Sequence, residues 1–298
     1  MKLISTLALT ILIASAAQSQ IVKIDSTTHW KKNLNFGINL NQASFSSNWK
    51  AGGVNSIGLN TLFNYKANYK KDVHSWDNEI DLLFGFVNNE GQGYRKTLDR
   101  IYLDTKYGRD INDKWGLFSS LSFTSQFTKG YKYNDDDTKD LISDIFAPAF
   151  ITSAWGVEYH PVDYFKVRLA PFAPRFTIVK DPTRFITTVS PTPYGVEPPD
   201  ETRVEVLAFQ MLAEFNKDIA ENINLKWRYV MFANYETLEG KKIDHRLDLN
   251  LTAKVNKFIN VGLGGILLYD YDQDTSVQLS QLMTIGFAYT FKNFEEKK

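Results

Sequence analysis

Residues 57–69 read IGLNTLFNYKANY, and the character of the side chains in this stretch changes at every step. Apolar and aromatic residues hold the odd positions, apart from Thr61. Glycine, asparagine and Lys66 hold the even positions, with Leu62 as the exception. A period of two places successive side chains on opposite faces of a β-strand. The stretch therefore predicts a strand with one apolar face and one polar face.

The same alternation recurs along the rest of the chain. A second clear case is 243–255, where leucines and other apolar residues alternate with Asp244, Arg246, Asp248 and Asn250. Weaker segments of the same character fill the intervals between the clear ones. Together they predict twelve strands, at about 34–46, 57–69, 76–86, 97–107, 115–127, 143–159, 163–179, 203–216, 223–235, 243–255, 258–271 and 276–291.

The lengths of these strands and of their connections indicate a membrane barrel. Strands of soluble proteins cluster near five or six residues, whereas roughly 9–11 suffice for a tilted strand to cross a bilayer, and these runs are longer. The connections alternate between short ones, such as 160–162, and longer ones, such as 128–142 and 180–202. This pattern is typical of an outer-membrane barrel. We predict an all-β fold, a transmembrane antiparallel up-and-down β-barrel of about 12 strands, with a soluble β-sandwich as the alternative.

The first 20 residues, MKLISTLALTILIASAAQSQ, have the three parts of a secretory signal. Lys2 gives a positive start, an apolar run follows, and small residues lie near a cleavage position at about Ala17 or Ser19. The apolar run is too short to span a bilayer as a helix. We therefore expect a signal peptide at 1–19, a periplasmic segment at 20–33, the barrel at 34–291 and a periplasmic tail at 292–298, in the outer membrane of a Gram-negative cell.

Composition excludes several classes of function. The 298 residues include 34 basic and 34 acidic side chains, so there is no overall field to attract nucleic acid. The absence of cysteine excludes disulfides, thiolate metal sites and cysteine nucleophiles. Large amphipathic rings, at 14% of residues, suit a lipid-facing surface.

Several short motifs resemble a family of Bacteroidota outer-membrane proteins known as domain-of-unknown-function family 3078. They are, in order, Trp49-Lys50-Ala51-Gly52-Gly53 through Asn64-Tyr65, Lys96-Thr97-Leu98-Asp99, Tyr107-Gly108, Ser125-Gln126-Phe127 with Gly130-Tyr131, Ala147-Pro148-Ala149 and Tyr159-His160-Pro161. The resemblance covers most of the chain and rests on the order of the motifs. It implies a membrane barrel and no established activity, so no catalytic residue follows from it.

The polar faces of the predicted strands carry charges of both signs, which we expect to face the lumen. The candidates are Lys66, Asp77, Glu79, Asp81, Arg100, Asp104, Lys166, Arg168, Lys226, Arg228, Arg246 and Asp248, with Lys106, Glu214, Asp244 and Lys254 in the same pattern. Opposite charges in a lumen of this size should pair, because unpaired desolvated charge is costly. The alternatives are a structural network of salt bridges and a narrow pore that selects a small polar solute.

Two kinds of loop stand out. One connection contains four acidic residues, Asp135, Asp136, Asp137 and Asp140, and the turn 270–274 reads DYDQD. The calcium-loop pattern would need a glycine and a glutamate where this turn is followed by Thr275 and Gln281. We therefore expect solvated loops and no metal. The proline-rich connection 181–200 either folds over the barrel mouth or is a stiff exposed loop.

His245 is the one histidine on the apolar face near the outer rim. Some outer-membrane lipid hydrolases place a His–Ser pair there, but here the neighbouring strands offer Tyr235 and Tyr269. An interfacial role of His245 is therefore favoured, and we expect no enzyme.

No cofactor motif is present. The hypotheses are a narrow channel for small polar solutes, a closed barrel with a role for its loops at the surface, and, remotely, a lipid hydrolase. The expected partners are outer-membrane lipid and the barrel assembly machinery.

Overall fold

The computed structural model describes residues 29–44, 54–136, 138–256 and 258–294. The expected signal peptide and most of the segment that follows it lie outside the described residues. The barrel strands themselves run from Trp30 to Lys292. The first strand therefore begins four residues before the predicted start at 34, and the last ends one residue after 291.

Twelve strands within the described residues form one closed ring, in which each strand pairs antiparallel with the next. They are β1 (Trp30–Ala43), β2 (Ser56–Lys71), β3 (His74–Asn89), β4 (Gly93–Asp110), β5 (Trp115–Ser125), β8 (Ala149–Val162), β9 (Phe165–Phe172), β12 (Ala208–Ala220), β13 (Ile223–Asn234), β14 (Asp244–Lys254), β15 (Ile259–Asp270) and β16 (Asp274–Lys292). Pairing of β1 with β16, from Asn33↔Lys292 to Ile38↔Phe287, closes the ring. Along these pairs, closure leaves no sheet edge, which a structure in lipid requires. The predicted fold class and strand number are confirmed.

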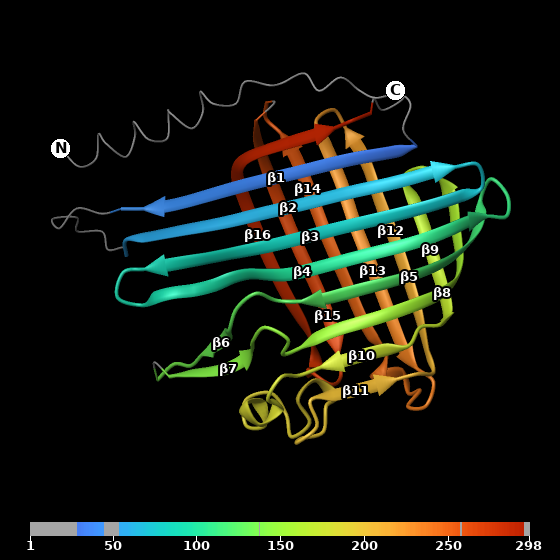
Figure 1. The fold of residues 1–298 in the computed structure, drawn as a ribbon. Coiled ribbons are helices and arrows are strands. Elements are labelled where there is room, and N and C mark those ends of the chain that lie inside the picture. The colour runs from blue at the N-terminus through green and yellow to red at the C-terminus, as the bar shows by residue number, and fades with distance from the viewer. Residues whose placement is uncertain (1–28, 45–53, 137, 257, 295–298) are drawn as a thin grey trace.

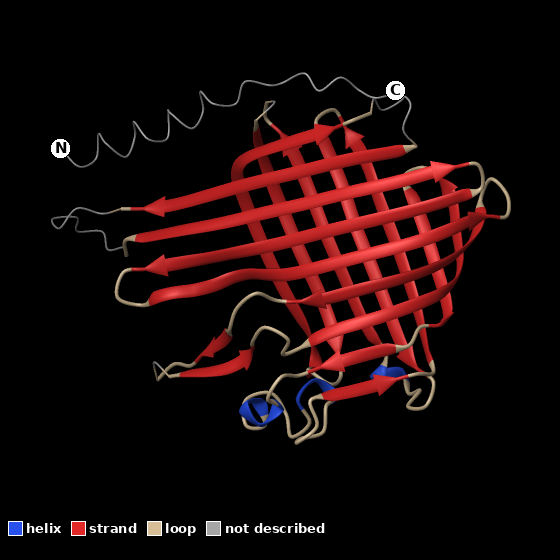
Figure 2. Cartoon of the chain, viewed as in Figure 1, coloured by secondary structure: helices blue, strands red, loops and turns tan. Residues whose placement is uncertain are grey.

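The ring has two different ends. In Figure 1 the strands β1 to β5 and β8 form the near wall, and β9 and β12 to β16 cross behind them. Turns of two to four residues, such as the one at Asp72 and Val73, close most connections at the end we call the short-turn end. The opposite, long-loop end carries the short helices drawn in blue in Figure 2.

Additional elements extend the barrel wall at the long-loop end. The hairpin of β6 (Gly130–Tyr133) and β7 (Lys139–Ser143) occupies the long connection after β5, and β10 (Arg175–Ile178) pairs with β8 and with β11 (Thr202–Glu205). Between β10 and β11 lie the 3-10 turns η1 (Pro182–Phe185) and η2 (Pro193–Gly195), and η3 (Gly240–Lys242) precedes β14.

Three details differ from the predicted elements. The predicted strand 163–179 is split into β9 and β10 at Ala173 and Pro174, where a proline has no N–H for the ladder. The strand predicted from 143 begins at Ala149, because Asp144–Pro148 form a turn closed by reciprocal backbone hydrogen bonds between Asp144 and Ala147. The long connection expected between the predicted strands 76–86 and 97–107 is a tight turn at 90–92, where Gly91 adopts φ +82°.

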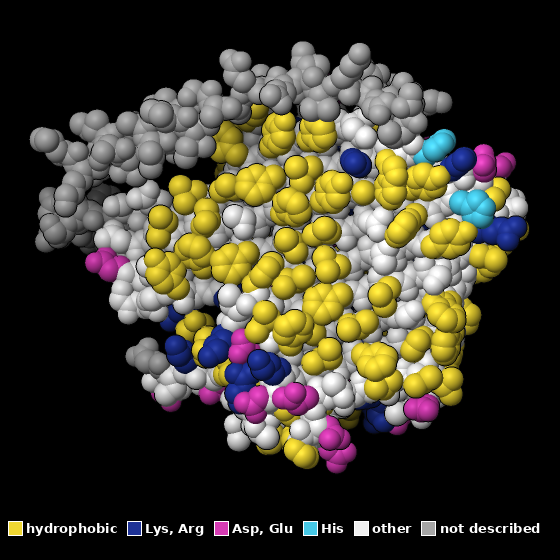
Figure 3. Space-filling view, in the orientation of Figure 1, with side chains coloured by type: hydrophobic (Ala, Val, Ile, Leu, Met, Phe, Trp, Pro, Cys, Tyr) yellow, Lys and Arg dark blue, Asp and Glu magenta, His cyan; other side chains and the backbone are white. Residues whose placement is uncertain are grey.

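The alternation along β5 shows which face looks outward. Leu117 and Leu121 are 51% and 50% exposed, whereas Phe118 and Ser120 between them are buried. Figure 3 shows the same on the whole near wall, where hydrophobic side chains cover the middle and charges gather towards the long-loop end and the opposite corner. A soluble sandwich would bury this apolar face between two sheets. No helix among the described residues is long and apolar enough to cross a bilayer.

Candidate functional site in the barrel lumen

Strand order decides which inward side chains can meet across the lumen. Counting round the ring, β3 and β13 are six strands apart, and so are β4 and β14. In a ring of twelve, these are opposite walls. The polar faces of all four strands carry inward charges, so pairs between them span the full lumen.

Arg228 forms the first connection between opposite walls. From β13, its Nη2 lies 2.5 Å from Oε2 of Glu79 on β3 and 2.6 Å from Oε1 of Glu214 on β12. Lys66 is 3.3 Å from Glu79, and Lys166 is 2.8 Å from Glu214, so each carboxylate contacts two cations.

Arg100 forms the second connection. From β4, its Nη2 lies 2.5 Å from Asp81 on β3, and its Nη1 lies 3.0 Å from Asp248 on the opposite strand β14. Arg246 is 2.9 Å from the other oxygen of Asp248. The amide of Asn64 donates to both Asp81 and Glu79, which joins the two connections into one network.

A third group of charges lies nearer the short-turn end. Arg168 on β9 is 3.0 Å from Glu158 and 3.3 Å from Asp104. Lys106 is 2.7 Å from Glu158 and 3.0 Å from Asp77. Glu79, Asp81, Lys106 and Arg168 are all less than a tenth exposed. Burial of this kind is tolerated only where charges are paired.

Eleven of the twelve predicted lumen residues take part in ion pairs. They are Lys66, Asp77, Glu79, Asp81, Arg100, Asp104, Lys166, Arg168, Arg228, Arg246 and Asp248. Lys226 forms no ion pair with any residue that the structure describes. In the wider set, Lys106, Glu214 and Asp244 are paired, whereas Lys254 is exposed at the end of β14.

The charge network lies between two cavities. The one at the long-loop end, which we call the outer cavity, has a volume of about 620 Å³, and Arg100, Asp104, Arg168 and Arg228 lie among its lining residues. The one at the short-turn end, the inner cavity, has about 610 Å³ and includes Asp77, Lys106, Glu158 and Lys166 in its lining. The paired charges therefore form a partition across the lumen, which we call the charge layer.

The outer cavity also has an apolar wall, which alternation alone misses. Its inward apolar side chains are Leu83, Leu98, Phe150, Leu212, Val230, Phe232, Ile266 and Leu268. Apart from Leu98, which lies between Thr97 and Asp99, these positions lie in runs where both strand faces are apolar, such as Leu82–Val87 and Ile266–Tyr269. An apolar run without alternation was the signal in the sequence that could have revealed this wall. A strand with one polar face would have had a polar residue at every second position of the run.

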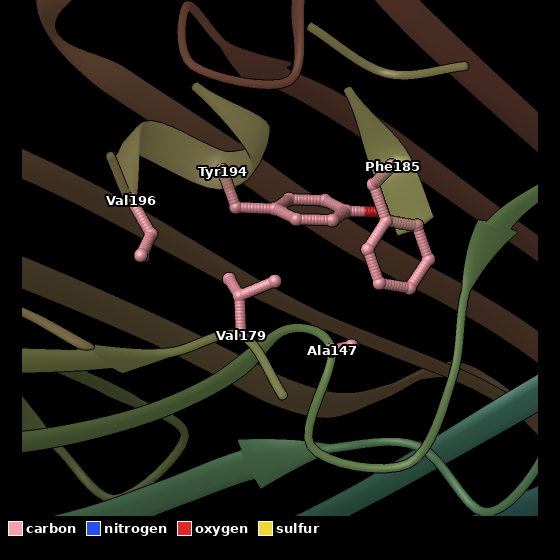
Figure 4. Close-up of a cluster of buried hydrophobic side chains, with 5 residues drawn as sticks. All are labelled: Ala147, Val179, Phe185, Tyr194 and Val196. Carbon is pink, nitrogen blue, oxygen red and sulfur yellow. The ribbon is translucent and has the colours of Figure 1, made fainter. Parts of the chain in front are cut away.

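The connection between β10 and β11, residues 179–201, lies over the outer cavity. Val179, Phe185, Tyr194 and Val196 pack with Ala147 into a small buried cluster (Figure 4). The Tyr194 hydroxyl donates to the Ile142 carbonyl on β7. Of the two alternatives for the proline-rich segment, the structure shows the folded one, in which Thr188, Val189 and Tyr194 line the cavity.

The surroundings shift the pKa values of two ionisable groups at the long-loop end, Tyr194 and Asp144. Burial raises the pKa of the Tyr194 phenol, and the Asp270 carboxylate adds to the rise, so the hydroxyl remains a donor. Desolvation acts to raise the pKa of Asp144. Hydrogen bonds from the Arg184 guanidinium and the Ile145 N–H outweigh it and hold that pKa below its ordinary value.

His245 lies between two tyrosines on the outer face of β14. Its Nδ1 is 2.7 Å from the Tyr229 hydroxyl, and its ring centroid is 6.4 Å from that of Tyr269. Tyr269 was predicted as a neighbour; Tyr235 was also predicted, but its hydroxyl donates to the Pro171 carbonyl instead. Met231 on β13 and Tyr269 on β15 lie directly across from His245, so neither of these two positions holds a serine.

Comparison with known proteins adds a family match and similar folds. The profile of a family described as "Protein of unknown function (DUF3078)" matches residues 40–131. Within that range, the resemblance found in the sequence is confirmed. No curated protein matches the chain.

Among solved structures, two are similar over most of the chain. The translocator domain of the autotransporter NalP from Neisseria meningitidis has 10% identity and a TM-score of 0.39, with 96% of this chain and 98% of that chain covered. An outer membrane channel from Pseudomonas putida F1 has 8% identity and a TM-score of 0.41, with 92% and 99% covered.

Proposed function

We propose that this protein is a narrow passage through the outer membrane of a Gram-negative bacterium for small polar solutes, closed at rest by the charge layer. The observation that carries the proposal is the pairing of Glu79 with Arg228 and of Asp81 and Asp248 with Arg100, between two cavities. A purely structural barrel has no need of open volume on both sides of a partition.

The chemistry of the charge layer suits a gate. Each arginine is held by two carboxylates, so opening requires these ion pairs to exchange partners with water or with a polar solute. Because both signs are present at the same level, neither cations nor anions are excluded by a single-sign ring. The passage would therefore select by size and polarity.

Conductance in planar bilayers tests the proposal. The wild-type barrel should show rare, small openings. The double variant Glu79→Gln/Arg228→Gln should open more often and conduct severalfold more, because it removes one connection between opposite walls and neutralises both of its ends. Glu214 keeps Lys166 as a partner, and only Lys66 loses its carboxylate.

The matched control is Glu239→Gln/Lys241→Gln, which neutralises an exposed ion pair outside the lumen. It should behave as wild type. A double lumen variant that folds, as judged by the gel migration of the unboiled protein, yet stays electrically silent would contradict the proposal.

The second candidate is a closed barrel whose loops act at the cell surface. The observation in its favour is the buried cluster of Phe185, Tyr194 and Val196, which gives 179–201 a fixed shape. Silence of every lumen variant, together with loss of a binding partner on deletion of 183–197, would support this candidate over a passage.

A further inference from the structure

The strands β1 and β16 close the ring along only part of their length. Their pairing ends at Ile38↔Phe287. Among the described residues, the next stretch of β1, 39–43, pairs only with β2, and the neighbouring stretch of β16, 274–286, pairs only with β15. In Figure 1, β16 bends away from β1 beyond the paired part. These two stretches are the margins of a gap in the wall, which we call the seam.

A stagger between strand ends does not explain the seam. If the observed register continued, Asn39 would lie opposite Gly286 and Ala43 opposite Leu282, so extended strand is present on both sides. Just past the last pair, the side chain of Asn39 takes the space that a Cβ at Gly286 would need. Beyond that point no pair joins the described parts of the two strands. The seam is therefore a separation of two strands that are in register to pair.

The exposure of β16 fits a gap beside it. Every residue of 274–281 is exposed, on the inward face as well as the outward one, whereas the inward Phe118 and Ser120 of β5 are buried. The outward side chains at the two margins are apolar, with Leu40 of β1 59% exposed and Ile285 of β16 57% exposed. They belong to the apolar face that meets lipid, so the seam opens at the depth of the hydrocarbon.

The outer cavity reaches the seam. Asp274 and Gln278, which lie in the unpaired stretch of β16, are among its lining residues. No described residue of β1 or β2 is among them. The lining therefore stops at the side where β1 and β2 would complete the wall.

The other sides of the outer cavity do not suit the passage of an apolar molecule. Arg100 and Arg228 of the charge layer are held by carboxylates, and an apolar molecule offers no group to replace either partner. The connection 179–201 lies over the opposite end. The wall between them nevertheless carries inward apolar side chains, such as Leu212 and Phe232. The seam is the direct route from this apolar wall to hydrocarbon.

The backbone at the seam has two ways to satisfy its hydrogen-bonding groups. An unpaired strand edge in hydrocarbon is costly, because each free N–H and C=O group there lacks a partner. Water in the outer cavity, with its volume of about 620 Å³, can serve the open margins. Pairing of 39–43 with 282–286 would satisfy the same groups without water. An open and a closed arrangement are therefore both accessible to this wall.

We propose that the seam is a lateral gate through which apolar molecules exchange between the outer cavity and the hydrocarbon of the membrane. The open arrangement is the one in this structure, and the gate closes when 39–43 pair with 282–286. This route goes beyond the proposed passage and does not rest on it, because a molecule that uses the seam does not cross the charge layer.

Cysteine pairs across the seam test its two arrangements. Leu40→Cys/Ile285→Cys lie opposite each other only if the pairing continues, whereas Phe36→Cys/Tyr289→Cys lie opposite each other in the paired part. Disulfide formation in phosphatidylcholine vesicles should be at least about tenfold slower across the seam, because a disulfide requires Cα atoms within roughly 7 Å, yet it should reach completion. Equal rates overturn the open arrangement, and a pair that never forms a disulfide overturns the closed one.

A small apolar photolabel dissolved in the bilayer tests the route itself. In the reduced Leu40→Cys/Ile285→Cys barrel, trifluoromethylphenyldiazirine should label the inward residues Leu212 and Phe232, as mapped by mass spectrometry. Oxidation of the same barrel should lower that labelling severalfold, because the closed wall separates the cavity from hydrocarbon, and should leave the outward Leu279 labelled as before. Oxidised Phe36→Cys/Tyr289→Cys, which carries its disulfide in the paired part, is the matched control and should label as its reduced form does.

The outcomes separate this inference from the proposed function. In barrels that migrate as folded, unlabelled Leu212 and Phe232, or labelling that oxidation across the seam leaves unchanged, overturns the lateral gate even if the barrel conducts. Labelling that is lost on oxidation of the seam pair alone supports the gate even if every barrel is electrically silent, in which case only the passage is overturned.

Discussion

Arg228 shows how a full charge is kept at the centre of the barrel. Its guanidinium contacts Glu79 and Glu214, and lies 4.7 Å from the centroid of the Tyr102 ring. Five donors in a planar fork can satisfy two carboxylates at once, which a lysine cannot do with the same geometry. The residue therefore links β3, β12 and β13 through a single side chain.

Replacing Arg228 with Met should destabilise the folded barrel strongly. Glu79 and Glu214 would keep one lysine partner each but lose the shared arginine, and removal of one partner of a buried pair costs about 3–5 kcal/mol. The temperature at which the unboiled protein loses its compact gel migration measures the effect. Lys241→Met, which removes an exposed partner of Glu239, is the control and should leave that temperature unchanged. Equal temperatures for Arg228→Met and wild type would show that the network contributes little to stability.

At the scale of the element, strands were predictable and their ends were not. Alternation in 57–69 identifies β2 because one of its faces meets lipid and the other the polar lumen. The same rule failed where proline interrupts a strand, as at Pro174, and where the chain turns early, as at Asp144. It also could not place the inward apolar residues of the barrel strands at the outer cavity, because the apolar face of each strand was assigned to lipid.

Ion pairs across the lumen were predictable only in part. The alternation with a period of two predicts that Glu79 and Arg228 face the lumen. Their pairing, however, depends on the ring of twelve strands, which puts β3 opposite β13. A ring with two more strands would move these walls apart and change the partners. The residues of the network can thus be predicted from sequence, whereas its connections require the closed barrel.

The connection 179–201 behaves as an element with its own core. Phe185→Ala removes a fully buried ring from the cluster with Val179 and Val196, at a cost of about 3–5 kcal/mol. This cost exceeds the stabilisation that the packing of a short segment can supply. We expect faster cleavage of this connection by added protease, with the barrel's gel migration unchanged. Ile186→Ala, at a neighbouring residue that is 39% exposed, is the control. Equal cleavage rates for the two variants would contradict a packed connection.

At the scale of the whole molecule, sidedness is the property on which the passage depends. Leu121 and Ser122 are adjacent on β5, yet Leu121 is half exposed on the outside and Ser122 lines the outer cavity. Leu267 and Leu268 make the same contrast on β15, although both are apolar, because Leu268 lines the cavity. The polarity of a side chain therefore does not by itself decide whether it faces lipid or the lumen. Its position in the alternation along a strand of the closed ring decides this.

Single cysteines introduced at these four positions test that sidedness directly, since the chain has no cysteine of its own. Spin labels at Leu121 and Leu267 should collide mainly with oxygen, which concentrates in lipid. Labels at Ser122 and Leu268 should collide less with oxygen, because the barrel wall separates them from hydrocarbon. The pair on β15 is the stringent one, because leucine is replaced at both positions and only the face differs. Equal oxygen collision rates for Leu267 and Leu268 labels in barrels that migrate as folded would show that this strand does not have one lipid face and one lumen face.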